Sequence, residues 1–279
     1  MRICSVGDNV VDRYVDRGVM YPGGNAVNVA VHIRRCGVES AYVGAVGDDA
    51  AGRVVGSALA DEGVDITRMR VLDGPNAYAS VRLVDGDRVF GDADLGVSVF
   101  TLDEADLDYL AGFDLVHTGD CSRLEGQVGD IAAVAPVSFD FSDRPVEYVE
   151  PLLPYVTFAT FSRSGLAEAD VRDLIKWAHS YGPRVVAVTR GAAGAVVSDG
   201  ESVATTVPAR TKVLDTLGAG DAFIARACVE LVGGATPTAI VSRATQYAAL
   251  TCQSFGAFGY EAPDLEPERD ATANSVATS

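Results

Sequence analysis

Lysine is nearly absent from this chain. Lys176 and Lys212 are its only lysines, and 22 basic side chains stand against 39 acidic ones, which gives a formal net charge of −17. A charge of this size and sign argues against nucleic acid and anionic membranes as partners, because both are polyanions. It does not exclude an anionic small molecule, since backbone N–H groups can bind one locally.

Cysteine motifs and long apolar runs are absent as well. No C-x-x-C occurs, and the cysteines are scattered and odd in number, which argues against a disulfide framework or a zinc site and for a reducing compartment. No apolar run is long enough to cross a bilayer, and residues 1–6 lack the apolar core of a signal peptide. We therefore expect a cytoplasmic protein with buried, unreactive cysteines. The five cysteines are Cys4, Cys36, Cys121, Cys228 and Cys252.

Short apolar segments alternate with helical patterns along most of the 279 residues. This alternation is typical of an α/β fold with a parallel sheet flanked by helices, and the length suits one large domain. We expect strands over residues 3–6, 41–46, 115–117, 137–141, 156–160 and 184–189, and helices over residues 25–35, 49–61 and 167–180.

Two segments break this rhythm. Residues 12–21 and 76–92 alternate polar and apolar side chains, and the second contains the turn dipeptide Asp85-Gly86, which predicts a hairpin with one solvated face. Residues 263–279 are acidic, then small and polar, and we expect a disordered tail after a single domain of residues 1–262.

The densest motif covers residues 215–223, Asp-Thr-Leu-Gly-Ala-Gly-Asp-Ala-Phe. Gly218 and Gly220 allow a tight turn and a close approach of the backbone to a ligand. Residues 222–232 predict a buried helix, whose first N–H groups and dipole form an anion site. Asp221 at that site suits a general base that deprotonates a hydroxyl while the N–H groups stabilise a transferring phosphoryl group. The alternative is a helix cap with an acidic residue in its first turn.

This motif resembles the D-T-x-G-A-G-D-x-F signature of the ribokinase-like (PfkB) carbohydrate kinases. A second family motif, G-G-x-x-x-N, is present in the right order as Gly23, Gly24 and Asn28. The resemblance covers residues 1–260 and is closest to the fructoselysine and fructosamine 6-kinase branch. The stretches that look like that branch are residues 7–12, 22–31, 87–92 and 139–143.

The resemblance implies a three-layer α/β/α fold with a mostly parallel central sheet and a small β-lid formed by residues 12–21 and 76–92. It also implies a kinase that uses ATP and Mg²⁺, with Asp221 as base and Gly218, Ala219 and Gly220 as the anion hole. The 6-hydroxyl of fructoselysine or a related fructosamine is the first candidate acceptor. Alternatives are fructose, ribose, 2-keto-3-deoxygluconate or a nucleoside, or a sugar- or nucleotide-binding relative without catalysis. A homodimer formed through the lid is a further expectation.

The acceptor is expected near the end of the first strand. Asp8 and Asp12 follow that strand, and ligands of open α/β sheets bind at the carboxyl ends of strands. Carboxylates there suit the hydroxyls of a polyol, although a pair of solvated loop acids is the alternative. The resemblance assigns sugar binding to Asp12, close backbone approach to Gly23 and Gly24, and a hydrogen bond with a sugar hydroxyl to Asn28.

The nucleotide is expected near a second glycine-rich turn. The resemblance assigns Thr189, Gly191 and Gly194 to the border of the nucleotide and Gly256 to the adenine pocket. Arg144 follows the strand predicted over residues 137–141 and is a candidate for phosphate contact, with an exposed loop arginine as the alternative. Without the family, residues 189–195 read as an ordinary turn between strands.

Two departures from the family pattern stand out. Residues 157–164 lack the N-x-x-E pair that many relatives use for Mg²⁺ and phosphate, so the metal ligands are not assigned. Arg226 occupies a position where a small residue is usual. The histidines share no metal-ligand spacing, and we expect each to be an ordinary helix or strand-end residue. They are His32, His117 and His179.

Overall fold

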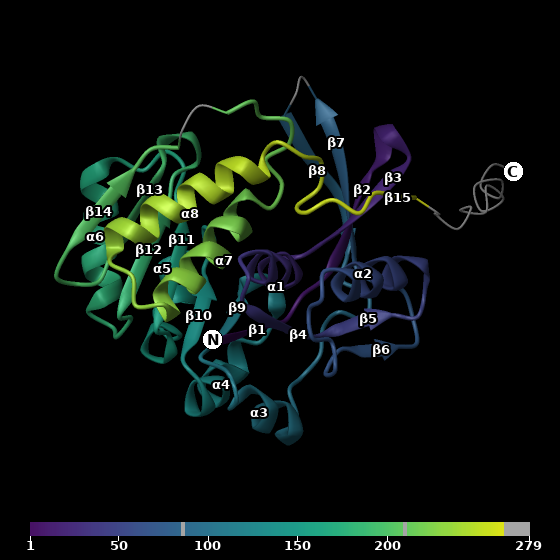
Figure 1. Ribbon diagram of the computed structural model, residues 1–279, viewed down its shortest axis with the longest axis horizontal. Coiled ribbons are helices and arrows are strands. Elements are labelled where there is room, and N and C mark those ends of the chain that lie inside the picture. Colours follow the sequence, from purple (N-terminus) through teal and green to yellow (C-terminus); the bar gives the residue numbers. More distant parts are fainter. Residues whose placement is uncertain (85–86, 209–210, 265–279) are drawn as a thin grey trace, which may run out of the picture.

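The structure is a computed structural model that describes residues 1–84, 87–208 and 211–264. Its main sheet has eight strands in the order β14-β13-β12-β11-β10-β9-β1-β4 (Figure 1). The strands from β4 to β12 in this order are parallel, β13 is antiparallel to β12, and β14 is antiparallel to β13. The bounds are β1 (Arg2–Val6), β4 (Glu39–Val43), β9 (Leu115–Gly119), β10 (Val137–Asp140), β11 (Phe158–Ser162), β12 (Val185–Thr189), β13 (Ala195–Ser198) and β14 (Val203–Thr206).

Helices cover both faces of this sheet. One face packs against α1 (Asn25–Arg35), α7 (Ala219–Val232) and α8 (Pro237–Thr251). The other packs against α3 (Glu104–Leu110), α4 (Val128–Val134), α5 (Val146–Val149) and α6 (Glu168–His179). This arrangement confirms the three-layer α/β/α fold predicted from the sequence. No helix among the described residues is long and apolar enough to cross a membrane.

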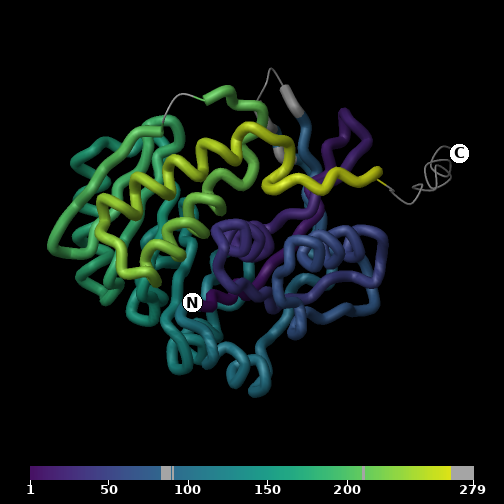
Figure 2. The backbone as a smooth tube through the Cα atoms, viewed as in Figure 1, coloured from purple at the N-terminus to yellow at the C-terminus, as the bar shows by residue number. Residues whose placement is uncertain are grey.

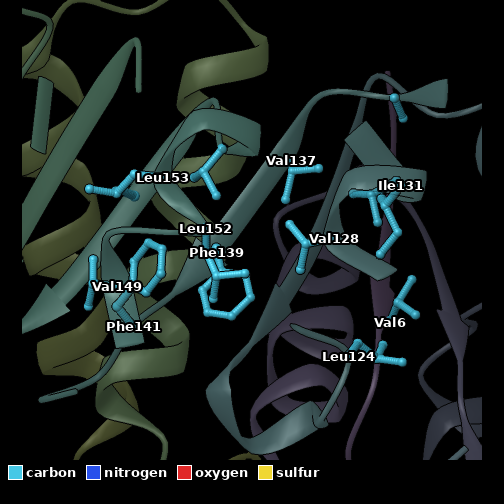
Figure 3. Packing of buried hydrophobic residues seen from close by; sticks show 14 of the residues in the cluster. Val6, Leu124, Val128, Ile131, Val137, Phe139, Phe141, Val149, Leu152 and Leu153 are labelled. Atoms are coloured by element: carbon cyan, nitrogen blue, oxygen red, sulfur yellow. The ribbon is translucent and has the colours of Figure 1, made fainter. Parts of the chain in front are cut away.

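Strand periodicity divides the core into these two layers. Successive side chains of a strand point to opposite faces, so Val137 and Phe139 of β10 pack toward α4 and α5, as Figure 3 shows. Ser138 between them faces the other layer, where its hydroxyl contacts Cys228 of α7. Most strand residues on both faces are apolar, as parallel sheets require.

A smaller sheet lies beside the main one, with the strand order β15-β3-β2-β7-β8 (Figure 1). The hairpin predicted over residues 76–92 is formed by β7 and β8, and its turn at residues 85–86 lies outside the described residues. The segment after α8 crosses to this sheet, where Pro263 pairs with Val19 (Figure 2). The tail predicted over residues 263–279 lies outside the described residues from position 265. The bounds are β2 (Val10–Tyr14), β3 (Val19–Gly23), β7 (Tyr78–Val84), β8 (Asp87–Asp94) and β15 (Ala262–Pro263).

The strand predicted over residues 41–46 is divided in the structure. β4 ends at Val43, and β5 leaves the main sheet to pair with β6. A side chain at Gly44 would overlap the Tyr42 ring, so glycine permits the bend between them. The remaining elements are β5 (Ala45–Gly47), α2 (Ala50–Asp61), β6 (Arg70–Leu72) and the 3₁₀ turns η1 (Val15–Arg17), η2 (Asp120–Ser122), η3 (Glu125–Gln127), η4 (Leu153–Tyr155) and η5 (Gly191–Ala193).

Candidate active site

Polar residues collect at one edge of the main sheet. The carboxyl ends of parallel strands share an edge, which is where open α/β sheets bind their ligands. The residues at or just after the ends of β1, β9, β10, β11 and β12 are Asp8, Asp120, Asp140, Ser162 and Thr189.

The turn before α7 depends on its glycines in two different ways. Gly218 has a φ of 71°, and a Cβ there would meet the Cβ of Ala257 at 2.5 Å, so this position requires glycine for both conformation and packing. A Cβ at Gly220 would meet nothing within 4 Å, so this glycine leaves open space. No side chain caps α7, and the first turn of the helix therefore retains N–H groups for an anion.

Asp215 holds the turn in place. Its Oδ1 accepts the N–H of Leu217 at 2.9 Å. Its Oδ2 accepts the hydroxyl of Tyr14 at 2.6 Å and the N–H of Gly256 at 3.0 Å. One buried carboxylate thus connects the turn, the smaller sheet and the segment after α8.

Two neighbouring cavities open beside this turn. The larger has a volume of about 520 Å³, and the smaller has about 290 Å³. Ser162, Thr189 and Gly220 border both cavities, so the two form a continuous site. Of the predicted nucleotide-binding residues, Thr189, Gly191 and Gly194 line the larger cavity together with Ala219 and Gly220.

The far part of the larger cavity is apolar. It is bordered by Val213, Phe223, Ala248, Ala249 and Cys252. A concave, largely apolar wall with a few polar groups is typical of small-molecule sites and suits a flat aromatic base.

The structure places two predicted nucleotide contacts elsewhere. Gly256 does not line either cavity, because its N–H is donated to Asp215 and its Cα lies against the ring of Tyr21. Arg144 borders neither cavity, because its Nε donates to Asp120 at 2.6 Å and its guanidinium lies over the ring of Tyr148.

Asp221 is held by two amides of α1. The Nδ2 groups of Asn25 and Asn28 donate to its two carboxylate oxygens at 2.8 and 2.7 Å. Burial raises the pKa of Asp221 to about 6, the two amides oppose that rise, and the charge of Asp8 adds to it. A carboxylate with this pKa is ionised at neutral pH and can still accept a proton from a reacting hydroxyl.

A second carboxylate, Asp140, is partly buried and shares one of these amides. It accepts hydrogen bonds from Asn25 Nδ2 at 3.1 Å, from the Ser142 N–H at 3.0 Å and from Thr160 Oγ1 at 3.1 Å. Burial, with the charges of Asp221 and Asp120, raises the pKa of Asp140 to about 7. Neither Asn25 nor Asp140 was predicted from the sequence as a site residue, although both lie in stretches that resemble the fructosamine branch.

Asp8 supports helix α1. Its carboxylate accepts the N–H groups of Asn25 at 2.8 Å and Ala26 at 3.3 Å, and the hydroxyl of Ser122 at 3.0 Å. Gly24 at the N-cap has no side chain for this task. Asp8 therefore fixes the position of Asn25, a role the sequence analysis did not predict.

Asp12, Gly23 and Gly24 lie where β2 and β3 approach α1. Asp12 is 4% exposed, and a Cβ at Gly23 would overlap its carboxylate. Gly24 has a φ of 102°, and a Cβ there would meet the Cα of Asn9 at 2.7 Å. Glycine at these positions thus makes room for the Asp12 carboxylate and the Asn9 backbone, and the close approach of this backbone to a sugar stays a prediction.

Asn28 keeps one polar atom unused. Its side chain is 4% exposed, and its Oδ1 has no hydrogen-bond partner among the described residues. A buried acceptor of this kind is costly unless a ligand hydroxyl donates to it. Asn28 is therefore available for the contact that the sequence predicts.

The two departures from the family pattern also have structural outcomes. Within the described residues, no group of three or more acidic, histidine or cysteine side chains is arranged to hold a metal ion. Arg226 donates to Glu230, which also accepts from Arg243 at 2.6 Å. This cluster joins α7 to α8, so Arg226 serves helix packing.

The chain is similar to known proteins over most of its length. Residues 3–263 match the family model described as pfkB family carbohydrate kinase. The chain belongs to this family. Fructosamine kinase FrlD of Bacillus subtilis (strain 168) is 42% identical over 269 residues, which cover 94% of this chain and 95% of that protein. Fructoselysine 6-kinase of Escherichia coli (strain K12) is 36% identical over 259 residues, which cover 92% and 99% of the two chains.

Solved structures of the family share the fold. A ribokinase of Arabidopsis thaliana complexed with ribose and ATP superposes with a TM-score of 0.82 at 23% identity and covers 93% of this chain and 95% of its own. The resemblance to the fructosamine branch that the sequence motifs indicate is confirmed by the two relatives above. The chain is an ATP-dependent sugar kinase.

Proposed function

We propose that this enzyme transfers the γ-phosphoryl group of ATP to the 6-hydroxyl of a fructosamine, with fructoselysine as the first compound to test. The observation that carries the proposal is the position of Asp221. Its carboxylate lies in the first turn of α7 and is bound by Asn28, whose Oδ1 is free to accept a hydroxyl. Base, acceptor contact and anion site thus meet at one point.

The nucleotide occupies the larger cavity in this proposal. Its base contacts the apolar wall formed by Phe223 and Ala248, and its phosphates extend toward Gly220. There the helix N–H groups stabilise the charge that develops on the transferring phosphoryl group. Asp221 takes the proton of the attacking hydroxyl as its oxygen bonds to the γ-phosphorus and the bond from that phosphorus to the bridging oxygen breaks, which releases ADP.

Magnesium fits the smaller cavity. Mg²⁺ usually keeps several waters and needs only one or two carboxylates besides the phosphates, so a cluster of three protein ligands is not required. Asp143, Ser162 and Ser164 border this cavity and would hold the ion or its waters. Asp140 is less suited because it already accepts three hydrogen bonds. The ion would neutralise charge between the phosphates.

The choice of a fructosamine rests on chemistry and on the relatives. A fructosamine carries an amine that is cationic when protonated, and the acceptor side is rich in carboxylates. Asp8 and Asp12 are its buried members, Asp140 and Asp221 are partly buried, and Asp92 and Asp94 are exposed on β8 of the smaller sheet. The 42% and 36% identical relatives are named as fructosamine and fructoselysine kinases.

A substrate panel tests the proposal. ATP consumption is measured with fructoselysine, fructose, ribose, 2-keto-3-deoxygluconate and a nucleoside, and the product is mapped by phosphorus NMR. We expect the highest kcat/KM with fructoselysine and a phosphate on its 6-hydroxyl. A higher kcat/KM with a neutral sugar would overturn the fructosamine assignment and leave the sugar-kinase assignment intact. No turnover with any compound would support a binding protein without catalysis.

The variant Asp12→Asn sharpens this test. If the carboxylate favours the cationic amine, the variant loses more kcat/KM with fructoselysine than with fructose. An equal loss with both sugars would contradict the electrostatic part of the proposal.

We also propose that the enzyme is cytoplasmic and forms a homodimer through the smaller sheet. Strand β8 is at the edge of that sheet, and Val89 on it is 50% exposed. An exposed strand edge can pair with a second copy. Analytical ultracentrifugation of the native protein and Val89→Lys tests this: a monomer in both would contradict the dimer.

A further inference from the structure

A polar row crosses the interior of the main sheet. Ser5, His117 and Ser138 lie side by side on β1, β9 and β10 in the register of the sheet, and all three are fully buried. They face the layer of α1 and α7, where the neighbouring strand residues such as Leu115 belong to an apolar core. Buried polar groups in an apolar layer lower stability unless they are hydrogen-bonded, so packing alone does not explain this row.

His117 is the centre of this row. Its Nδ1 lies 3.0 Å from Ser138 Oγ, and its Nε2 lies 3.0 Å from Asn25 Oδ1. Burial lowers the pKa of His117 to about 3, so the ring is neutral and carries one proton. An amide oxygen can only accept, so that proton is on Nε2 and points at Asn25.

The orientation of Asn25 follows from its neighbours. Its Nδ2 donates to Asp221 Oδ1 at 2.8 Å and to Asp140 Oδ2 at 3.1 Å, which uses both amide hydrogens. In the flipped orientation the amide oxygen would face two carboxylates, and the NH₂ group would face the Nε2–H of His117. The two carboxylates therefore select the orientation in which Asn25 donates to both of them, and the Nε2–H of His117 donates to the amide oxygen that this orientation presents.

The hydrogen bonds form a chain in which every donor points toward Asp221. Cys228 Sγ donates to Ser138 Oγ at 3.4 Å, and Ser138 then donates to the unprotonated Nδ1 of His117. The chain continues through Nε2–H to Asn25 and ends on Asp221. Each bond polarises the next, so the amide donates more strongly to the carboxylate.

We propose that His117 is a positioning residue of the kinase: through Asn25 it holds the carboxylate of Asp221 in its reactive orientation. This inference rests on Asp221 being the base of the proposed function. It does not depend on which sugar is the acceptor. From the sequence, His117 was predicted to be an ordinary strand-end residue.

The charges around Asp221 define what the chain must oppose. Asp8 after β1, Asp140 at the end of β10 and Asp120 in η2 are the carboxylates nearby, and Cys121 lies among them. Arg144 is the cation that pairs with Asp120. Because these acids favour protonation of Asp221, losing the Asn25 donor moves its titration to higher pH.

Three variants test the proposal, with the sugar that gives turnover in the substrate panel. His117→Leu removes the ring and keeps the bulk, His117→Gln keeps an N–H that can donate to Asn25, and Asn25→Ala removes the final donor. The readouts are kcat, KM and the acid limb of the kcat/KM–pH profile. We expect Asn25→Ala to move that limb up by about one pH unit, the size of one hydrogen bond to a carboxylate. His117→Leu should lower kcat about tenfold with little change in KM, and should move the limb in the same direction.

His117→Gln should retain most of the wild-type kcat and should leave the acid limb close to its wild-type position. If the leucine and glutamine variants behave alike, or if neither moves the acid limb, the proposal is wrong and His117 serves packing alone. His32→Leu is the matched control, because His32 is also buried and neutral but bonds Tyr247 and Ala257. His32→Leu should lower the melting temperature without shifting the acid limb of the kcat/KM–pH profile. The failure of the base assignment itself would be seen separately, as turnover that survives Asp221→Asn.

Discussion

The nucleotide side and the acceptor side of the site are constructed differently. The larger cavity is bordered by backbone and small side chains such as Gly191, Ala192 and Gly220. The acceptor side is filled by side chains that hold one another, and the Asn25 amide there donates to two carboxylates. On the nucleotide side, glycines lack the Cβ atoms that would fill the space for the ligand. On the acceptor side, amides held by hydrogen bonds position the carboxylates.

This difference predicts two kinds of mutational response. On the nucleotide side, added bulk should remove activity while the fold is retained. On the acceptor side, a change of one atom should remove activity without any change of shape.

Asp221→Asn should lower kcat by about 10²- to 10⁴-fold, because the amide keeps the shape but cannot accept the hydroxyl proton. The dissociation constants of ATP and sugar, measured by calorimetry, should stay within about threefold of wild type. Turnover close to wild type would remove Asp221 from the mechanism.

Two glycine variants compare adjacent positions of one turn. Gly220→Val should cut turnover sharply and leave the melting temperature nearly unchanged, since its Cβ enters open space at the phosphate site. Gly218→Val should unfold the turn, because its Cβ would meet Ala257 at 2.5 Å and its φ is 71°. The melting temperature and the turnover of both variants test this difference between the two glycines. A stable, fully active Gly220→Val would show that phosphate binds elsewhere.

The acceptor-side carboxylates should make stability depend on pH. The pKa of Asp140 is about 7 in the folded protein against 3.8 for an ordinary aspartate, so between these values the folded state binds the extra proton. Its contribution therefore favours folding at low pH and is lost as pH rises through 7. The free energy of unfolding of Asp140→Asn minus that of wild type should increase by on the order of 1–3 kcal/mol from pH 5 to pH 8.

Wild type and Asp140→Asn must be compared at each pH, because the buried histidines make stability change with pH in the opposite direction. The pKa values of His32 and His117 are lowered to about 4 and about 3, so these residues cost stability as pH falls below about 6.5. Urea unfolding of both proteins across the range provides the difference. A difference that does not change with pH would contradict the raised pKa of Asp140.

The smallest effect is expected for Arg144→Gln. Its guanidinium is bound by Asp120 and does not border the cavities, so KM for ATP should change less than about threefold. A tenfold or larger increase in that KM would restore the phosphate contact that the sequence motif suggests.

The sequence predicts the fold well because its signals are local. Helix 25–35 follows directly from apolar periodicity after two glycines, and the structure has it with the same bounds. The division of the strand at Gly44 was missed because the apolar run continues across it, and the lack of room beside the Tyr42 ring is seen only in the folded chain.

The placement of Gly218, Gly220 and Asp221 at the start of a helix was predictable, because their motif and the apolar run after it are local signals. Their roles in catalysis stay predictions. The role of His117 was not predictable, because it depends on neighbours 92 and 21 positions away along the chain. The displacement of Gly256 from the cavity likewise depends on Tyr21 and Asp215, which are distant in sequence.

The rate of the chemical step as a function of pH tests the central claim most directly. Rapid-quench single turnovers would follow phosphoryl transfer between pH 5 and pH 8 with saturating ATP and sugar. With Asp221 as base and a pKa of about 6, the rate should be constant above pH 7 and fall toward tenfold per unit below pH 6. A rate that does not change over this range, or an acid limb that persists in Asp221→Asn, would contradict the role assigned to this carboxylate.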